Sequence, residues 1–102
     1  MIPSRKLTDE QLGVLIIATE CLHAFWAVKN IYPDCRPQRG LILEYAARNG
    51  GSIKMKPTTY TYQGVTVEAE TIDDKRTRGI NNFEILDAYY VHLFGYSITT
   101  VI

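Results

Sequence analysis

The sequence has few residues that could form covalent or metal cross-links, and it has no excess of charge. Its 102 residues include only two cysteines, Cys21 and Cys35, too few for a disulfide framework or a four-thiolate zinc site. Eleven basic residues balance eleven acidic ones, so no net field attracts the chain to DNA, RNA or anionic lipid. We therefore predict neither a metal nor a cofactor, and no nucleic-acid partner.

Catalytic and targeting motifs are also absent from the sequence. It has no G-x-S-x-G elbow, no phosphate-binding loop and no histidine spacing that suits a metal. Residues 1–11 lack the apolar core of a signal peptide, which favours a cytoplasmic location. The apolar run 12–28 is short for a membrane span and contains Glu20 and His23, so we predict no membrane crossing.

The composition is that of one folded domain. Hydrophobic residues make up 46% of the chain and charged residues 22%, as in ordinary globular proteins and unlike disordered ones. A chain of this length buries enough surface for one modest core. We predict a single domain over residues 1–102, without linkers or repeats.

The first predicted helix is marked by its caps. Thr8 can cap it, Gln11 stands at the third helical position, and the helix should end at about Lys29 or Asn30. Because residues 12–28 are almost wholly apolar, this helix should be central, or half covered by another subunit. The pattern predicts a homo-oligomer formed through residues 9–29.

Two further helices and several strands follow. Pro37 can open a second helix over residues 38–48, and Gly95 can end a third helix that Asn81 caps. A period of two predicts a strand from Ser52 onward, then a hairpin over residues 58–71.

Within that hairpin the turn falls at Gln63-Gly64, which places tyrosine opposite valine on the buried side. A last strand should cover residues 96–102. The prediction is an α+β fold of order α-α-β-β-β-α-β, with a small, mostly antiparallel sheet packed on helices.

The segment "DDKRTRGINNF", residues 73–83, is the strongest candidate for a binding site. Three basic residues, Lys75, Arg76 and Arg78, precede a helix amino terminus, where backbone N–H groups favour an anion. If Asn81 caps that helix, Asn82 remains free to bind a polar edge of a ligand. Four more side chains are predicted to complete the pocket: Arg36, Arg39, Tyr60 and Tyr62. Arginine, asparagine and aromatic groups together suit a nucleotide-like ligand.

Three functions fit these features. The first is a small non-enzymatic protein, of the kind that phages and mobile elements carry, that sequesters an anionic, nucleotide-type molecule. The second is an inhibitor or adaptor that binds a host protein through a surface rich in tyrosine and arginine. The third is a small hydrolase or transferase that uses Glu20 with His23, or His92 with a partner from elsewhere.

Overall fold

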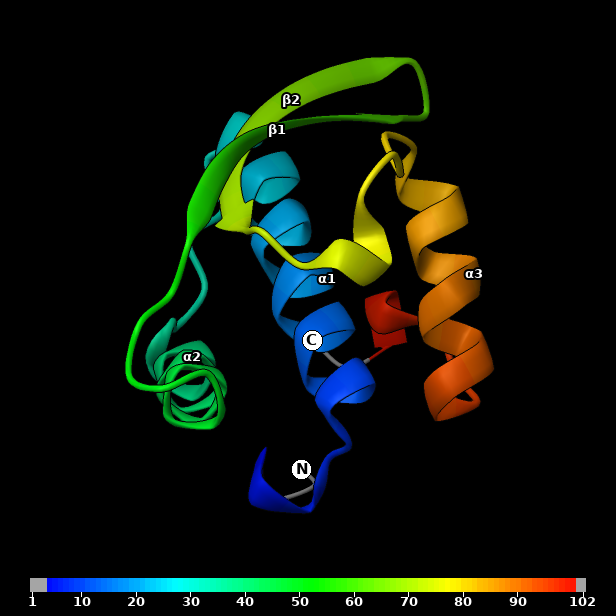
Figure 1. The fold of residues 1–102 in the computed structure, drawn as a ribbon. Coiled ribbons are helices and arrows are strands. Elements are labelled where there is room, and N and C mark those ends of the chain that lie inside the picture. Colours follow the sequence, from blue (N-terminus) through cyan, green and yellow to red (C-terminus); the bar gives the residue numbers. More distant parts are fainter. Residues whose placement is uncertain (1–3, 101–102) are drawn as a thin grey trace.

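The computed structural model describes residues 4–100 and confirms the α+β class (Figure 1). Helix α1 runs through the middle, α2 and α3 flank it on opposite sides, and a hairpin crosses one end. The elements are α1 (Asp9–Val28), α2 (Arg36–Arg48), β1 (Met55–Tyr62), β2 (Val65–Ile72) and α3 (Phe83–Phe94), with short 3-10 turns η1 (Ser4–Lys6), η2 (Lys75–Thr77) and η3 (Ile98–Thr100).

Helix α1 begins as its caps predict. The Thr8 side chain accepts a hydrogen bond from the Gln11 N–H, and the Gln11 side chain accepts one from the Thr8 N–H, both at 3.0 Å. This reciprocal capping box satisfies two N–H groups that the first turn would otherwise leave unpaired. The helix ends at Val28, with Lys29 as its carboxyl cap, close to the predicted boundary.

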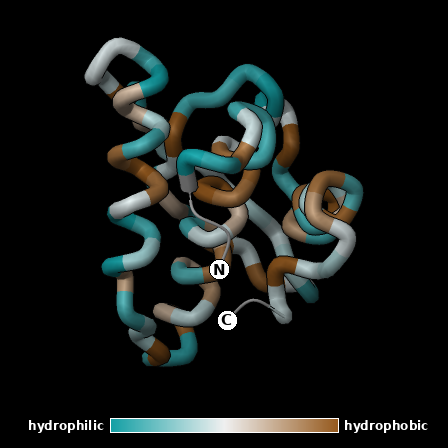
Figure 2. The backbone as a smooth tube through the Cα atoms, turned by 90° about the horizontal axis from the view of Figure 1, so that it is seen from below, coloured by the Kyte–Doolittle hydropathy of each residue, from teal (hydrophilic) through white to brown (hydrophobic). Residues whose placement is uncertain are grey.

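The apolar character of α1 is explained by its central position in the fold. It packs against β2, α3, α2 and η3, and half of its residues are buried. In Figure 2 hydrophobic positions recur along the helices, while hydrophilic positions dominate the loops. Helix α1 is long and apolar enough to cross a membrane, but a buried core helix of a soluble protein can have the same length and composition.

The start of α2 and the end of α3 lie at the predicted signals. Pro37 stands in the first turn of α2, and Gly95 ends α3 with a left-handed φ of 83°. Two side chains of α1 tie α3 in place: Tyr89 donates a hydrogen bond to the Glu10 carboxylate, and the Gln11 amide donates one to a backbone carbonyl at the end of α3.

The hairpin has the predicted turn and register. Gln63 and Gly64 have φ values of 49° and 78°, the conformation of a two-residue turn that matches strand twist. Tyr60 pairs with Val67 and Tyr62 with Val65, as expected from that turn. Tyr60 and Val67 are buried, whereas the glutamates of β2, on the opposite face, are exposed.

The prediction of a separate strand from Ser52 to Lys56 is wrong. The last residues of this predicted strand belong to β1, which runs without a break from Met55 to Tyr62. One two-stranded hairpin therefore replaces the three predicted strands. Pro57 does not interrupt β1, although proline donates no backbone hydrogen bond. In a two-stranded ribbon each strand keeps one free edge, and proline is tolerated there.

The predicted carboxyl-terminal strand is also absent from the part of the chain that the structure describes. Residues 98–100 form η3 instead, and residues 101–102 lie outside the described range. The Asp87 carboxylate accepts hydrogen bonds from the Ser97 hydroxyl at 2.8 Å and from the Ile98 N–H at 2.9 Å. These bonds satisfy the turn locally, and the Ile98 side chain is completely buried.

Candidate functional site

The predicted binding segment, residues 73–83, has its arginines paired with its own acids. Arg76 donates to the Asp74 carboxylate twice, from Nε at 2.8 Å and from Nη2 at 2.6 Å. Arg78 donates to Asp73 at 3.1 Å. A ligand at these arginines would therefore have to compete with a carboxylate that is already in place.

Asp74 is the buried centre of this segment. Its carboxylate also accepts the Tyr45 hydroxyl at 3.0 Å and the Arg76 N–H at 2.9 Å. Burial alone would raise the pKa of Asp74, but these bonds and the Arg76 guanidinium hold it below its usual range. Burial and the neighbouring carboxylate raise the pKa of Tyr45 to about 12.

A glycine in α1 allows this carboxylate to approach the helix. A Cβ at Gly13 would lie 2.5 Å from Asp74 Oδ2, closer than real contacts permit. The absence of a side chain therefore lets η2 pack directly on the first turns of α1.

The cap of α3 differs from the prediction by one residue. Asn82 is the cap, and its side-chain oxygen accepts the N–H groups of Glu84 at 2.8 Å and Ile85 at 3.3 Å. Asn81 instead uses its carbonyl to accept the Thr61 N–H at 3.0 Å. The Asn82 side chain, which was predicted to be free for a ligand, instead uses its oxygen to cap the helix.

The other predicted site residues lie in separate places. Tyr60 is 2% exposed, and Tyr62 stacks on Phe83 with ring centroids 4.9 Å apart, so both rings belong to the core around the hairpin. Arg36 is bound by Asp34 at 2.7 Å. Arg39 is exposed on the first turn of α2. Within residues 4–100, no hydrogen bond or ion pair joins Arg36 or Arg39 to the segment 73–83.

Arg76 does share a hollow with Lys75, its neighbour in the predicted segment, and with Arg48, which the sequence did not single out. We call it the basic hollow; it has a volume of about 200 Å³ and lies where α1, α2 and η2 meet. It is lined by Asp9, Leu12, Tyr45, Arg48, Asn49, Lys75 and Arg76. No local pattern predicts this group, because residues 48 and 75 approach each other only through packing.

The charges in the basic hollow are partly compensated. Arg48 lies 2.9 Å from Asp9 and 3.1 Å from Glu44. The Asp9 side chain is 73% exposed, so its contact with Arg48 is a surface pair that a ligand can displace at low cost. Lys75 is exposed and has no ion pair or hydrogen bond within the described residues.

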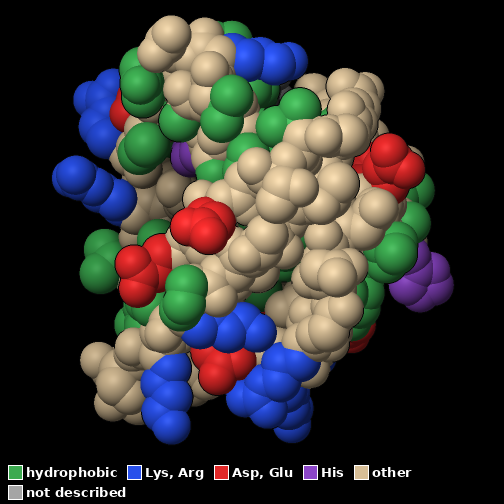
Figure 3. All heavy atoms as spheres, turned by 90° about the horizontal axis from the view of Figure 1, so that it is seen from above, with side chains coloured by type: hydrophobic (Ala, Val, Ile, Leu, Met, Phe, Trp, Pro, Cys, Tyr) green, Lys and Arg blue, Asp and Glu red, His purple; other side chains and the backbone are tan. Residues whose placement is uncertain are grey.

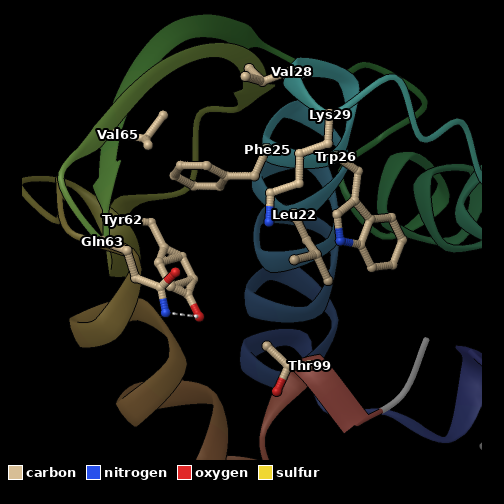
Figure 4. Close-up of a pocket in the computed structure, with 9 residues that line it drawn as sticks. All are labelled: Leu22, Phe25, Trp26, Val28, Lys29, Tyr62, Gln63, Val65 and Thr99. Atoms are coloured by element: carbon tan, nitrogen blue, oxygen red, sulfur yellow. Dashed lines mark hydrogen bonds between the residues drawn. The ribbon is translucent and has the colours of Figure 1, made fainter.

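A second, apolar hollow of about 210 Å³ lies between the end of α1 and the hairpin tip (Figure 4). In Figure 4 the Phe25 ring and the Lys29 side chain extend into it. Its rim includes Val28 and Val65, which are 63% and 44% exposed. The lining residues are Leu22, Phe25, Trp26, Val28, Lys29, Tyr62, Gln63, Val65 and Thr99.

Among the residues that the structure describes, Glu20 and His23, the pair predicted for an enzymatic function, do not contact each other through a hydrogen bond. Glu20 points toward the hairpin, and its Oε2 is buried without a hydrogen-bond partner. Burial raises the pKa of Glu20 to about 8; the backbone at Ile72 opposes this rise, and the Glu70 charge adds to it. No hydrogen bond joins Glu20 to His23 in the described part of the chain, and His92 is exposed on α3.

His23 instead faces a cysteine from another element. Its Nδ1 lies 4.0 Å from the Sγ of Cys35, the residue that precedes α2. This contact could not be predicted from the sequence, because only the turn between α1 and α2 brings the two residues together. Over residues 4–100, no group of three or more His, Cys, Asp or Glu side chains is arranged to hold a metal ion.

Basic and acidic side chains are interspersed on the face seen in Figure 3, rather than gathered into one basic patch.

Comparison with known proteins gives no relative: no protein-family model, curated protein or solved structure matches this chain.

Proposed function

We propose that this protein binds a small phosphorylated ligand in the basic hollow, without transforming it. The observation that supports this proposal is the convergence of Arg48, Lys75 and Arg76, from two separate segments, on one hollow. Guanidinium groups bind phosphate through paired N–H donors, and a lysine adds a mobile charge. The proposed ligand is still the anion predicted from the sequence. Its proposed site is no longer the start of α3 but the basic hollow, where α1, α2 and η2 meet.

The size and chemistry of the basic hollow limit which ligands can fit in it. A volume of about 200 Å³ is below the roughly 300 Å³ at which pockets enclose a drug-sized molecule. The hollow therefore suits a phosphate or diphosphate group, and the rest of a nucleotide would lie outside it. Its lining includes no histidine or cysteine that could act as a base or nucleophile near neutral pH, which favours binding over turnover.

Replacing Lys75 by alanine should weaken binding of ATP about tenfold, because one charge-assisted contact is lost. Isothermal titration calorimetry with ATP, pyrophosphate and adenosine measures this, and adenosine should not bind. Since Lys75 is exposed, its removal should leave the fold intact.

Arg78→Ala is the matched control for this titration. It removes one cation from the same loop, at the helix-terminal position predicted from the sequence, and should leave the affinity unchanged. Weaker binding in Arg78→Ala with normal binding in Lys75→Ala would move the site back to the start of α3. The absence of heat from both ATP and pyrophosphate would refute the anion-binding function.

A second candidate function, self-association, is favoured by the apolar hollow. Four large exposed apolar side chains lie at or near the end of α1 and the hairpin tip: Val28, Ile31, Tyr32 and Val65. The hollow carries a single charged residue, Lys29, so two copies would meet there with little like-charge repulsion. We infer that a second copy of the chain covers this surface, at the end of the helix predicted to form the oligomer.

Replacing Val28 by aspartate should convert a dimer into a monomer, because a charged side chain would replace an apolar contact at the interface. Sedimentation velocity at several concentrations measures the oligomeric state. Leu43→Asp on α2 is the matched control, since Leu43 is 70% exposed on a different face and should not affect assembly. A wild-type protein that remains monomeric at high concentration would contradict this proposal. The apolar surface would then be a candidate binding site for a different protein.

A further inference from the structure

Cys35 and His23 form a pair of side chains that the functions proposed so far do not use. Cys35 is exposed directly before α2, and His23 is half-buried in the carboxyl-terminal half of α1. The distance from Sγ to Nδ1 is 4.0 Å, and the thiol also lies 3.5 Å from the Pro33 carbonyl. Contacts between a nucleophile and its base are often this long before the reactant arrives.

The surroundings of His23 suit a base. Its ring stacks on Trp26 with centroids 5.9 Å apart and an interplanar angle of 27°, which limits its rotation. Burial lowers the pKa of His23, and the neighbouring Gln38 side chain opposes part of that shift. The imidazole is therefore neutral at neutral pH and available to accept a proton.

We propose that Cys35 and His23 form a base-assisted thiol site that undergoes thiol–disulfide exchange with a small disulfide from solution. The exposed thiol supplies the nucleophile, and the imidazole across the turn receives its proton. This is a covalent modification site directly before α2, and neither Cys35 nor His23 lines either hollow.

The exchange balances without another reactant. The Sγ proton passes to His23 Nδ1, and Sγ attacks one sulfur of the disulfide. A new disulfide bond forms to Cys35 as the original one breaks, and the departing thiolate takes the proton from the imidazolium. Cys35 is oxidised to a mixed disulfide, and half of the small disulfide is reduced to a free thiol.

The backbone near Cys35 favours this reaction over acyl transfer. An acyl transfer enzyme needs N–H donors for the oxyanion that forms at a carbonyl. Here the Arg36 N–H already donates to Asp34 at 3.0 Å, and Pro37 has no N–H. Disulfide exchange places its developing charge on sulfur and needs no such donors.

The mixed disulfide should persist once it forms. Cys21 is the only other cysteine, and it is fully buried, so it cannot attack the new bond and release the small thiol. The expected product is therefore a stable cap on Cys35, which a reducing agent reverses.

The test is the reaction of the folded protein with 5,5′-dithiobis(2-nitrobenzoate) at pH 7, followed by absorbance. One thiol per chain should react rapidly, and Cys35→Ser should abolish that phase, while buried Cys21 stays silent. His23→Gln should slow the phase at least about tenfold. His92→Gln, which alters an exposed histidine on α3, should react like the wild type.

Two measurements test whether the fast reaction depends on the folded pair and whether it occurs at Cys35. In guanidinium chloride the wild type and His23→Gln should react at the same rate, because the pair exists only in the folded chain. Incubation with glutathione disulfide should add one glutathionyl group, and peptide mass mapping should locate it at Cys35. Equal rates for folded wild type and His23→Gln would overturn the proposal, as would a slow reaction of Cys35 itself.

Discussion

Replacing Asp74 by alanine should lower the free energy of unfolding by about 3 kcal/mol, the largest loss that we expect from a polar substitution in this protein. The Asp74 side chain is 2% exposed, and its removal leaves Arg76 and the Tyr45 hydroxyl without their partner. Removing one member of a buried ion pair costs about 3 to 5 kcal/mol. We expect the lower end because the Arg76 side chain, 28% exposed, can partly reach water. Urea unfolding followed by circular dichroism measures the change.

Asp34→Ala is an unusually close control for this substitution. Asp34 binds the N–H and guanidinium of Arg36, two residues later, just as Asp74 binds those of Arg76. The Asp34 and Arg36 side chains are 53% and 85% exposed, so solvent replaces the lost contacts. Equal losses in the two variants would show that the local bonds, and not burial, determine the contribution of Asp74.

Lowering the pH should remove the contribution of Asp74 to the free energy of unfolding. The folded state holds the pKa of this carboxyl below its usual value, so its stabilisation is present above about pH 4 and declines as the pH falls further. Asp74→Ala should lack this part of the decline.

Replacing Glu20 by glutamine should make the protein more stable than the wild type at pH 9, by about 2 to 3 kcal/mol. Folding raises the pKa of this carboxyl from 4.5 to about 8. The wild type should therefore lose stability as the pH rises from about 4.5 to 8 and change little above that range. A shift of this size sets an upper bound of about 5 kcal/mol, which water at the partly exposed side chain reduces.

Urea unfolding of both proteins at pH 5, 7 and 9 isolates the contribution of Glu20, since their difference cancels the other titrating groups. The difference should grow with pH. Glu68→Gln is the control, because it changes an exposed carboxyl on β2 that does not contribute to the pKa shift of Glu20, and it should keep the wild-type pH dependence. A constant difference between wild type and Glu20→Gln from pH 5 to 9 would mean that Glu20 ionises normally in the folded protein.

Local chemistry determined much of the fold. The Thr8–Gln11 capping box and the left-handed Gly95 depend on backbone groups within a few residues, and both were predicted. The Gln63-Gly64 turn fixed the register of the hairpin for the same reason. Predictions were wrong where distant contacts decided the outcome. Asn81 binds the hairpin and leaves the cap to Asn82.

The candidate sites show this division most clearly. The pairs Asp34–Arg36 and Asp74–Arg76 have the same spacing, and the sequence by itself determines the bond that each makes. Only the tertiary structure decides that one pair is exposed while the other is buried against Gly13 of α1. The two hollows and the Cys35–His23 contact likewise arise from packing between segments far apart in the chain. Spacing along a sequence sets local geometry, but burial and the meeting of distant side chains depend on how whole elements pack.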